Sequence, residues 1–275
     1  MAEFDPAGPL AGVRVLDLSR VLAGPWCTQS LADLGADVLK VEAPGTGDET
    51  RTWGPPYMDD MAAYYTCANR SKRSLALDLK SPEAVDLVRR LAMHADVLIE
   101  NFKDGTMERF GLSAETLQAA NPALIFCSIS GYGREGPNAD RVGYDFIIQA
   151  EAGLMSITGE VAGTPMKVGV AVSDLFSAFY ASQAILAALF ERGRTGKGRR
   201  IDIALFDCQL AALANVAANT LASGTTPGRH ANSHPNVVPN ELFDTPGGGM
   251  VISVGNDPQF RALCGVLERP DMATD

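Results

Sequence analysis

The stretch VRVLDLSRVLAGPWCTQSLADLGADVLKVE, residues 13–42, contains the smallest unit from which the fold can be predicted. Residues 13–17 form a short apolar run, and a second apolar run covers residues 36–42. Between them, a Gly-Pro pair opens a segment of helical character over residues 24–34. Strand, helix and strand in this order are typical of two parallel strands joined by a right-handed crossover.

The same alternation continues along most of the chain. It predicts further strands and helices, the strands at 74–79, 96–100, 124–129 and 200–205 and the helices at 81–95, 113–121, 174–192 and 207–222. The helix at 81–95 has the clearest start, with Ser81 as N-cap, Pro82 as first helical residue and Glu83 in the first turn. We therefore predict an α/β fold with a parallel sheet.

The character of the sequence changes after Gly224. We expect a large domain over residues 1–222, a linker or binding loop over 223–240, and the start of a small α+β domain over 241–275. This last part predicts a hairpin, with strands at 241–245 and 250–254 and a turn over 246–249, followed by a short helix at 258–267. Two strands and one helix make a marginal unit. We therefore expect this chain to be C-terminally truncated or to need a partner chain.

Composition excludes several classes of function. The net charge of −10 disfavours nucleic acid and membrane surfaces as partners, so an anionic ligand would need a local basic cluster. The five cysteines are scattered without C-x-x-C or metal-ligand spacing, which predicts free, mostly buried thiols in a reducing compartment and no metal site. No signal peptide, transit peptide or membrane-spanning stretch is evident. We expect a cytoplasmic protein.

The stretch VGVAVSD, residues 168–174, is followed at once by a long apolar helix. This order places Asp174 in the first turn, where exposed backbone N–H groups and the helix dipole favour a negative charge. On local pattern alone, Asp174 is most simply an N-cap.

Two basic runs interrupt the acidic sequence. The run NRSKR, residues 69–73, precedes a predicted strand and suits either a solvated loop or a phosphate clamp, which Arg51, Lys103 and Arg109 could join. The run GKGRR, residues 196–200, follows a predicted helix end, where cations are favourable for a structural reason.

Taken together, these motifs resemble the class III CoA-transferases, the family of formyl-CoA transferase and carnitine CoA-transferase. The resemblance runs from about residue 9 to the end of the chain and within the family is greatest to the succinyl-CoA:glutarate (dicarboxylate) CoA-transferases. The matching stretches are 15–25, 34–42, 69–79, 100–102, 128–133, 136–137, 143–145 and 195–198, with 51–56, 153–159 and 236–239 for the narrower group.

The resemblance implies that Asp174 is a catalytic nucleophile. Its carboxylate would attack an acyl-CoA thioester, forming a mixed anhydride and then an aspartyl-CoA thioester, from which CoA passes to a carboxylic or dicarboxylic acid. Such chemistry needs an ionised carboxylate, and we expect the helix N-terminus to keep Asp174 ionised. The α-methylacyl-CoA racemases share this fold but use a histidine where this chain has Tyr144. A tyrosine with an ordinary pKa near 10 is a poor base at neutral pH, which favours a transferase over a racemase.

The resemblance also implies where substrates bind. CoA, as a substrate and not a tightly bound cofactor, would contact a turn and three basic residues: Arg20, Val21, Leu22, Lys72, Arg73 and Arg109. Tyr144 and the loop residues His230, Asn232 and His234 would help to select the acceptor acid near Asp174. A plain exposed loop is the alternative for the two histidines.

The family fold implied is a Rossmann-like large domain with a smaller domain, in two chains that interlock as a homodimer. Two other functions stay open. One is an acyl-CoA racemase or isomerase, and the other is a non-catalytic CoA-binding paralogue.

Overall fold

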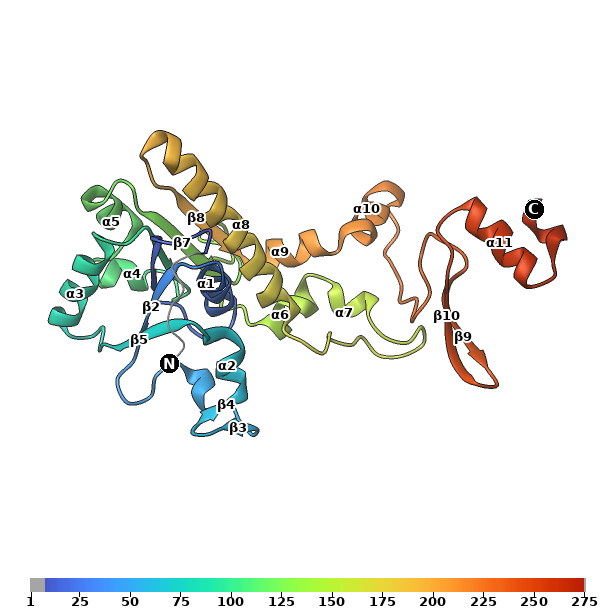
Figure 1. Ribbon diagram of the computed structural model, residues 1–275, viewed down its shortest axis with the longest axis horizontal. Helices are drawn as coiled ribbons and strands as arrows, with labels where there is room; N and C mark the ends of the chain where they lie inside the picture. The colour runs from blue at the N-terminus through green and yellow to red at the C-terminus, as the bar shows by residue number, and fades with distance from the viewer. Residues whose placement is uncertain (1–7, 275) are drawn as a thin grey trace. The chain divides into compact units, whose positions relative to one another are not determined.

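The computed structural model describes residues 8–274 and contains a six-stranded parallel sheet with helices packed around it (Figure 1). The strand order is β5-β2-β1-β6-β7-β8. The strands are β1 (Arg14–Asp17), β2 (Asp37–Glu42), β5 (Lys72–Ala76), β6 (Val97–Glu100), β7 (Ile125–Ser130) and β8 (Arg200–Ala204). All five pairings are parallel, so the predicted α/β class is confirmed.

Helices cover the sheet with two separate apolar cores. Val15 and Val97 contribute to one core with α1 (Ala23–Asp33) and α8 (Val172–Thr195). Leu16 and Leu98, their neighbours in sequence, contribute to the other core with the remaining sheet helices. These helices are α3 (Pro82–Ala92), α4 (Thr106–Arg109) and α5 (Ala114–Ala120). Successive side chains of a strand point to opposite faces, and both faces are covered, which explains the continuous apolar runs.

The predicted elements have the right type but shifted ends. Strand β5 starts at Lys72, inside the basic run, rather than at Ser74. Helix α3 has the predicted Ser81 cap, whose side chain accepts a hydrogen bond from Ala84 N, but it ends at Ala92. The helix predicted at 207–222 is two helices, α9 (Leu205–Ala212) and α10 (Ala214–Ser223). A positive φ of 45° at Ala214 marks the point where the helical path is interrupted.

Short elements in the connections were not predicted, because brief segments carry too few residues to show a periodicity. They are η1 (Glu49–Thr52), β3 (Tyr57–Met58), β4 (Met61–Ala62), α2 (Ala63–Asn69), α4 (Thr106–Arg109), α6 (Asp145–Glu151) and α7 (Leu154–Ile157).

The chain divides into two compact units. The first holds the sheet and contains the described residues up to Ala152 together with Gly169–Ala217. The second contains Gly153–Val168 and the residues from Ala218 onward. The division predicted from the sequence, at residues 222 and 240, stays a prediction. It places Gly153–Val168 with the large domain, whereas contacts group that segment with the C-terminal part.

In the second unit, β9 (Asn240–Thr245) and β10 (Gly248–Ser253) form the predicted antiparallel hairpin. Its turn is Pro246 and Gly247, shorter than the predicted four residues, because Gly248 and Gly249 already pair with β9. Helix α11 (Asp257–Val266) and the 3₁₀ helix η2 (Pro270–Thr274) follow. Within this unit, Arg229 joins the two chain segments, donating from Nε to Glu160 O at 2.9 Å.

Helix α8 is long and apolar enough to cross a membrane by length and composition alone, contrary to the expectation that no such stretch exists. Its packing gives another reason for that composition. Ala178, Ala181 and Ile185 are fully buried in the core with the sheet. Length and apolar composition alone are therefore weak evidence that α8 crosses a membrane.

Candidate functional site

A cavity of about 260 Å³ opens where β1 ends and α1 begins. Three of the residues predicted to bind CoA, Arg20, Val21 and Leu22, line it. Tyr144 and Asp174 line the same cavity, from the starts of α6 and α8. The fold thus brings together five predicted site residues that lie up to 154 positions apart in the chain (174 − 20). Their place, at the carboxyl ends of parallel strands, is where open α/β sheets bind ligands.

Asp174 does not cap its helix. Helix α8 begins at Val172, so Asp174 is its third residue, and the N-cap position, Ala171, provides no side-chain hydrogen bond. The helix start is instead held by Asp145, whose Oδ1 accepts a hydrogen bond from Ser173 N at 2.8 Å. The interpretation of Asp174 as an N-cap is therefore wrong. The capping contact comes from another helix, and Asp174 is one of the residues that line the cavity.

The expectation that the helix N-terminus keeps Asp174 ionised is also contradicted. Burial and the nearby charge of Asp145 together raise the pKa of Asp174 from 3.8 to about 7. The helix dipole does favour the anion, but removal of water and a like charge oppose it more strongly. Close to neutral pH, Asp174 exists as a mixture of acid and carboxylate.

Two tyrosines belong to the surroundings of Asp174, Tyr144 as a lining residue of the same cavity and Tyr64 through the effect of the Asp174 charge on its pKa. Tyr144 is 59% exposed and lies at the N-cap of α6 without a capping side-chain bond. Tyr64 of α2 packs edge-on against Trp53, with ring centroids 5.2 Å apart. Burial and then the charge of Asp174 raise the pKa of Tyr64 to about 12, so it stays a neutral hydrogen-bond donor.

The start of α1 provides a second polar feature. Ala23, its first residue, lines the cavity, and the helix has neither a side-chain cap nor an acidic residue in its first turn. The first N–H groups of a helix have no partner within it and favour an anion. The cavity therefore combines an acidic group that can act as a nucleophile with backbone donors suited to a developing oxyanion.

A second cavity, of about 430 Å³, adjoins the first. Both are lined by Arg20, Glu49, Phe102 and Lys103. The exposed Lys103 has no ion-pair partner among residues 8–274 and is available to an anionic ligand. Two adjoining cavities suit a long substrate with a reactive end and a distal anionic end.

The other predicted CoA contacts lie outside both cavities. Lys72 is buried and its ammonium lies 3.1 Å from Asp17 Oδ2. Arg73 is exposed and pairs with Asp37, and Arg70 pairs with Asp33. The basic run therefore has its charges balanced within the chain, which favours its structural interpretation over a free phosphate clamp.

Arg109 and Arg51 make different contacts within the chain. Arg109 is exposed on α4, between Thr106 and Phe110, which line the second cavity. Its guanidinium donates to Thr106 Oγ1 at 2.9 Å. Arg51, which the clamp could have included, instead contacts Glu42 at 2.7 Å.

His230, Asn232 and His234 lie in the second unit, whereas Asp174 lies in the first. His234 has a structural contact, because its Nδ1 accepts hydrogen bonds from Asn236 N and Val237 N at 3.0 and 3.1 Å. His230 and Asn232 are exposed. Their role in selecting an acceptor, and their proximity to Asp174, stay predictions.

All five cysteines are free, and only Cys67 is exposed. Within residues 8–274, no group of three or more His, Cys, Asp or Glu side chains is arranged to hold a metal ion.

Sequence reasoning did not select Asp145, Asn101, Lys40 or Asp48 as site residues, although all four support the cavity walls. Asp145 and Asn101 fall within motifs that carried the family resemblance, which was the available signal. Lys40 also falls within such a motif, at 34–42, and Asp48 does not. The contacts of both with the turn that follows β1 become apparent only in the fold, because the two residues lie in and after β2.

Comparison with known proteins identifies the family of this chain. Residues 10–275 match the profile of CoA-transferase family III. The chain is 53% identical to a succinate–glutarate CoA-transferase of Agrobacterium fabrum, over 97% of this chain and 68% of that protein. It is 45% identical to the mouse succinyl-CoA:glutarate CoA-transferase, of which it spans 63%. The crystal structure of a CAIB/BAIF family protein from Brucella suis superposes with a TM-score of 0.86 and 50% identity, covering 98% of this chain and 72% of that one.

Proposed function

Because this chain belongs to CoA-transferase family III, we propose that it moves coenzyme A from an acyl-CoA thioester to a small carboxylic or dicarboxylic acid, with Asp174 as nucleophile. The observation that carries the proposal is the single cavity lined by Asp174 and the turn at Arg20, Val21 and Leu22. The names of the similar proteins suggest succinyl-CoA as donor and a dicarboxylate such as glutarate as acceptor.

The proposed reaction has four balanced steps. The Asp174 carboxylate attacks the thioester carbonyl carbon, the C–S bond breaks, and a mixed anhydride and CoA thiolate form. The thiolate attacks the aspartyl carbonyl, which releases the donor acid and leaves an aspartyl-CoA thioester. The acceptor carboxylate attacks this thioester to give a second anhydride and thiolate. The thiolate then attacks the acceptor acyl carbon and regenerates Asp174.

The geometry supports particular roles in these steps. Burial strengthens the nucleophilicity of the Asp174 carboxylate once it is ionised, since the anion has lost stabilising water. The uncapped start of α1 can donate to the tetrahedral oxyanion. The second cavity and Lys103 suit the distal phosphate-bearing part of the CoA molecule.

The test is detection of the covalent intermediate. Incubation with succinyl-CoA should give an adduct on Asp174, seen by intact mass and by trapping with hydroxylamine or borohydride. Asp174→Asn should give neither adduct nor turnover. Above pH 7 it should unfold at no lower temperature than the parent, because it removes a carboxyl group whose folded pKa is raised. Retained turnover in this variant would exclude Asp174 as nucleophile.

A screen of succinyl-CoA with glutarate, mesaconate and oxalate, read as new CoA thioesters, identifies the acceptor.

The two alternative functions, racemase and non-catalytic paralogue, give different results. A racemase would exchange the α-proton of a branched acyl-CoA in deuterated water without an acceptor, and a non-catalytic paralogue would bind CoA without transfer. The interlocked homodimer also stays a prediction, which sedimentation analysis tests.

A further inference from the structure

The turn from Ser19 to Val21 is held almost entirely by side chains from elsewhere. Ser19 N donates to Asp17 Oδ1, and Ser19 O accepts from Lys40 Nζ at 2.8 Å. Asn101 contacts both polar groups of the next residue, since it accepts from Arg20 N and donates to Arg20 O, each at 2.8 Å. Val21 N donates to both carboxylate oxygens of Asp48, at 3.3 and 3.2 Å. The turn therefore takes its shape from its surroundings.

Val21 shows why such support is needed. Its φ is 67°, in the left-handed region that a β-branched residue rarely adopts. A conformation of this kind costs about 1–3 kcal/mol and persists only where neighbouring groups enforce it. Because Val21 lines the first cavity, relaxation of the turn would change the shape of that cavity.

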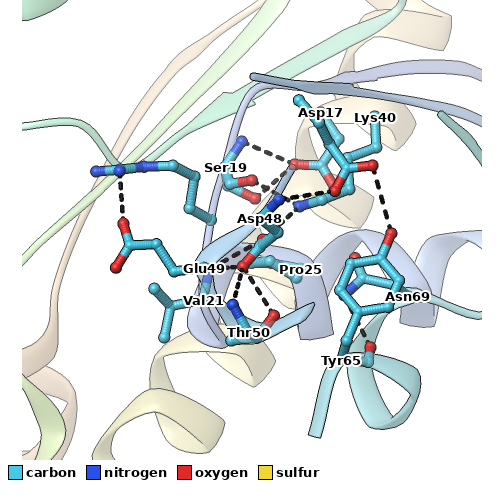
Figure 2. Close-up of polar contacts among 12 residues, drawn as sticks. Asp17, Ser19, Val21, Pro25, Lys40, Asp48, Glu49, Thr50, Tyr65 and Asn69 are labelled. Atoms are coloured by element: carbon cyan, nitrogen blue, oxygen red, sulfur yellow. Dashed lines mark hydrogen bonds and ion pairs between the residues drawn. The ribbon is translucent and has the colours of Figure 1, made fainter. Parts of the chain in front are cut away.

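Lys40 and Asp48 form a buried ion pair beneath this turn (Figure 2). Their side chains are 1% and 0% exposed, and Lys40 Nζ lies 3.0 Å from Asp48 Oδ2. Asp48 also accepts from Thr50 N and Thr50 Oγ1, so it orders the start of η1. The next residue, Glu49, pairs with Arg20 at 2.7 Å, and both of these side chains line both cavities.

A buried ion pair contributes little to net stability, since removing two charges from water costs about as much as their attraction provides. Its contacts therefore need another explanation. Lys40 and Asp48 each hold one peptide group of the turn, and both also line the second cavity. The pair thus links the walls of the two cavities.

We propose that Lys40 and Asp48 are positioning residues, whose buried ion pair holds the turn at Ser19–Val21 in the geometry required for CoA binding and for attack by Asp174. This inference rests on the proposed CoA-transfer function. It assigns neither residue a contact with the reacting atoms. Misplacement of the groups of a site by about 1 Å can slow a reaction roughly 100-fold. Relaxation of the turn should therefore lower the rate by a measurable factor.

The test compares Asp48→Asn with a matched control, Asp96→Asn. Asp96 also accepts a backbone hydrogen bond next to β1, from Arg14 N at 2.7 Å, and also pairs with a cation, Arg192, at 2.9 Å. It lies at the opposite end of β1 and lines neither cavity. With succinyl-CoA, Asp48→Asn should slow adduct formation about 100-fold and weaken binding of free CoA by calorimetry. Asp96→Asn should change neither quantity by more than about 3-fold.

A double variant separates positioning from folding. Lys40→Met with Asp48→Leu replaces the pair by apolar groups of similar shape, which restores stability relative to either single change. It leaves Ser19 O and Val21 N without these partners, so the rate of adduct formation should stay low. Recovery of the rate along with stability would overturn the proposal.

The outcomes also separate this inference from the proposed function. If the parent chain forms no adduct with any donor, the proposed function fails. The positioning role of Lys40 and Asp48 is then decided by calorimetry alone, from the affinity of Asp48→Asn and Asp96→Asn for free CoA. If Asp48→Asn matches Asp96→Asn in both adduct rate and CoA affinity, the positioning proposal is wrong while the proposed function stands.

Discussion

At the scale of single residues, the acidity of Asp174 is set first by its burial and then by the charge of Asp145, which is 29 positions away in the chain (174 − 145). Asp145 has two effects on α8. Its Oδ1 holds the start of the helix through Ser173 N, and its charge adds to burial in raising the pKa of Asp174 to about 7. Gln149 fixes the other oxygen, donating from Nε2 to Asp145 Oδ2 at 2.7 Å. The same carboxylate thus holds the start of the helix that carries Asp174 and helps to raise the pKa of this proposed nucleophile.

This arrangement predicts the pH dependence of the proposed reaction. Adduct formation should rise with pH through about 7 as Asp174 ionises, and then level off. Asp145→Asn keeps an oxygen for Ser173 N but removes the charge, so the midpoint should move to lower pH. Single-turnover rates with succinyl-CoA from pH 5 to 9 measure this. A midpoint that stays at the parent value in Asp145→Asn would contradict the electrostatic role of Asp145.

At the scale of elements, α8 shows how tertiary contacts and local signals share the definition of one helix. Its start is defined by Asp145 from α6, whereas its end is defined locally. Gly196 follows the last helical residue with φ 69° and donates from its N–H to Arg192 O at 2.8 Å. A glycine in this conformation is a common helix stop.

Two glycines of this helix allow a matched experiment. An added Cβ meets nothing within 4 Å at either Gly193 or Gly196, so only backbone conformation separates them. Gly196→Ala should destabilise the fold by about 1 kcal/mol, because alanine is strained at positive φ. Gly193→Ala should stabilise it by up to about 1 kcal/mol, since Gly193 lies inside the helix. Urea denaturation measures the free energy of unfolding of both variants. Equal changes would show that the positive φ of Gly196 does not determine the effect of the alanine.

At the scale of the whole molecule, buried charges concentrate at the ends of β1 and β2, below the cavities. Burial alone would raise the pKa of Asp17, but the ammonium groups of Lys72 and Lys40 and the hydroxyls of Ser19 and Thr28 lower it to about 2. Burial also opposes ionisation of Glu42. Contacts with Arg51, Ser74 and Asp48 N nevertheless lower the pKa of Glu42 to about 2. The first unit therefore depends on ionised carboxylates in its interior.

These shifts predict a loss of stability in acid. A carboxyl group with a lowered folded pKa stabilises the fold above its unfolded pKa, here 3.8 for Asp17 and 4.5 for Glu42. That contribution is lost as pH falls from 4.5 to about 2. Denaturation followed by tryptophan fluorescence, from Trp26 in α1 and from Trp53, should show the loss. Glu42→Gln should be less stable at pH 7 by about 2–3 kcal/mol and should depend less on pH. An equal pH dependence in both proteins would contradict this account.

The strand–helix alternation was predictable because each strand is an apolar run and each long helix carries an apolar face. These patterns repeat over enough residues to be read without the fold. Connections such as α2 and α6 were not predictable, because they are short and their packing partners are distant in sequence. Motifs selected Asp174 and the turn at Arg20–Leu22, which line one cavity, and their roles in binding and catalysis stay predictions.

The basic run shows the limit of reasoning from residue type. Charge density at 69–73 suggested a ligand clamp, but the fold places Asp17 of β1, Asp33 of α1 and Asp37 of β2 beside its three paired cations. Partners that lie 36 to 55 positions away cannot be seen from the run itself. The folded arrangement of β5 with β2, β1 and the end of α1 decides which cations of the run are paired within the chain.

By itself, the sequence determined the parallel α/β architecture, the family and the identity of the candidate nucleophile. All three depend on local order: periodic apolar runs, and motifs in a fixed succession. The tertiary structure decided the protonation of Asp174, the true cap of its helix and the support of the turn at Val21. These properties depend on burial and on charges brought together across the sheet, and such quantities arise only when distant segments pack.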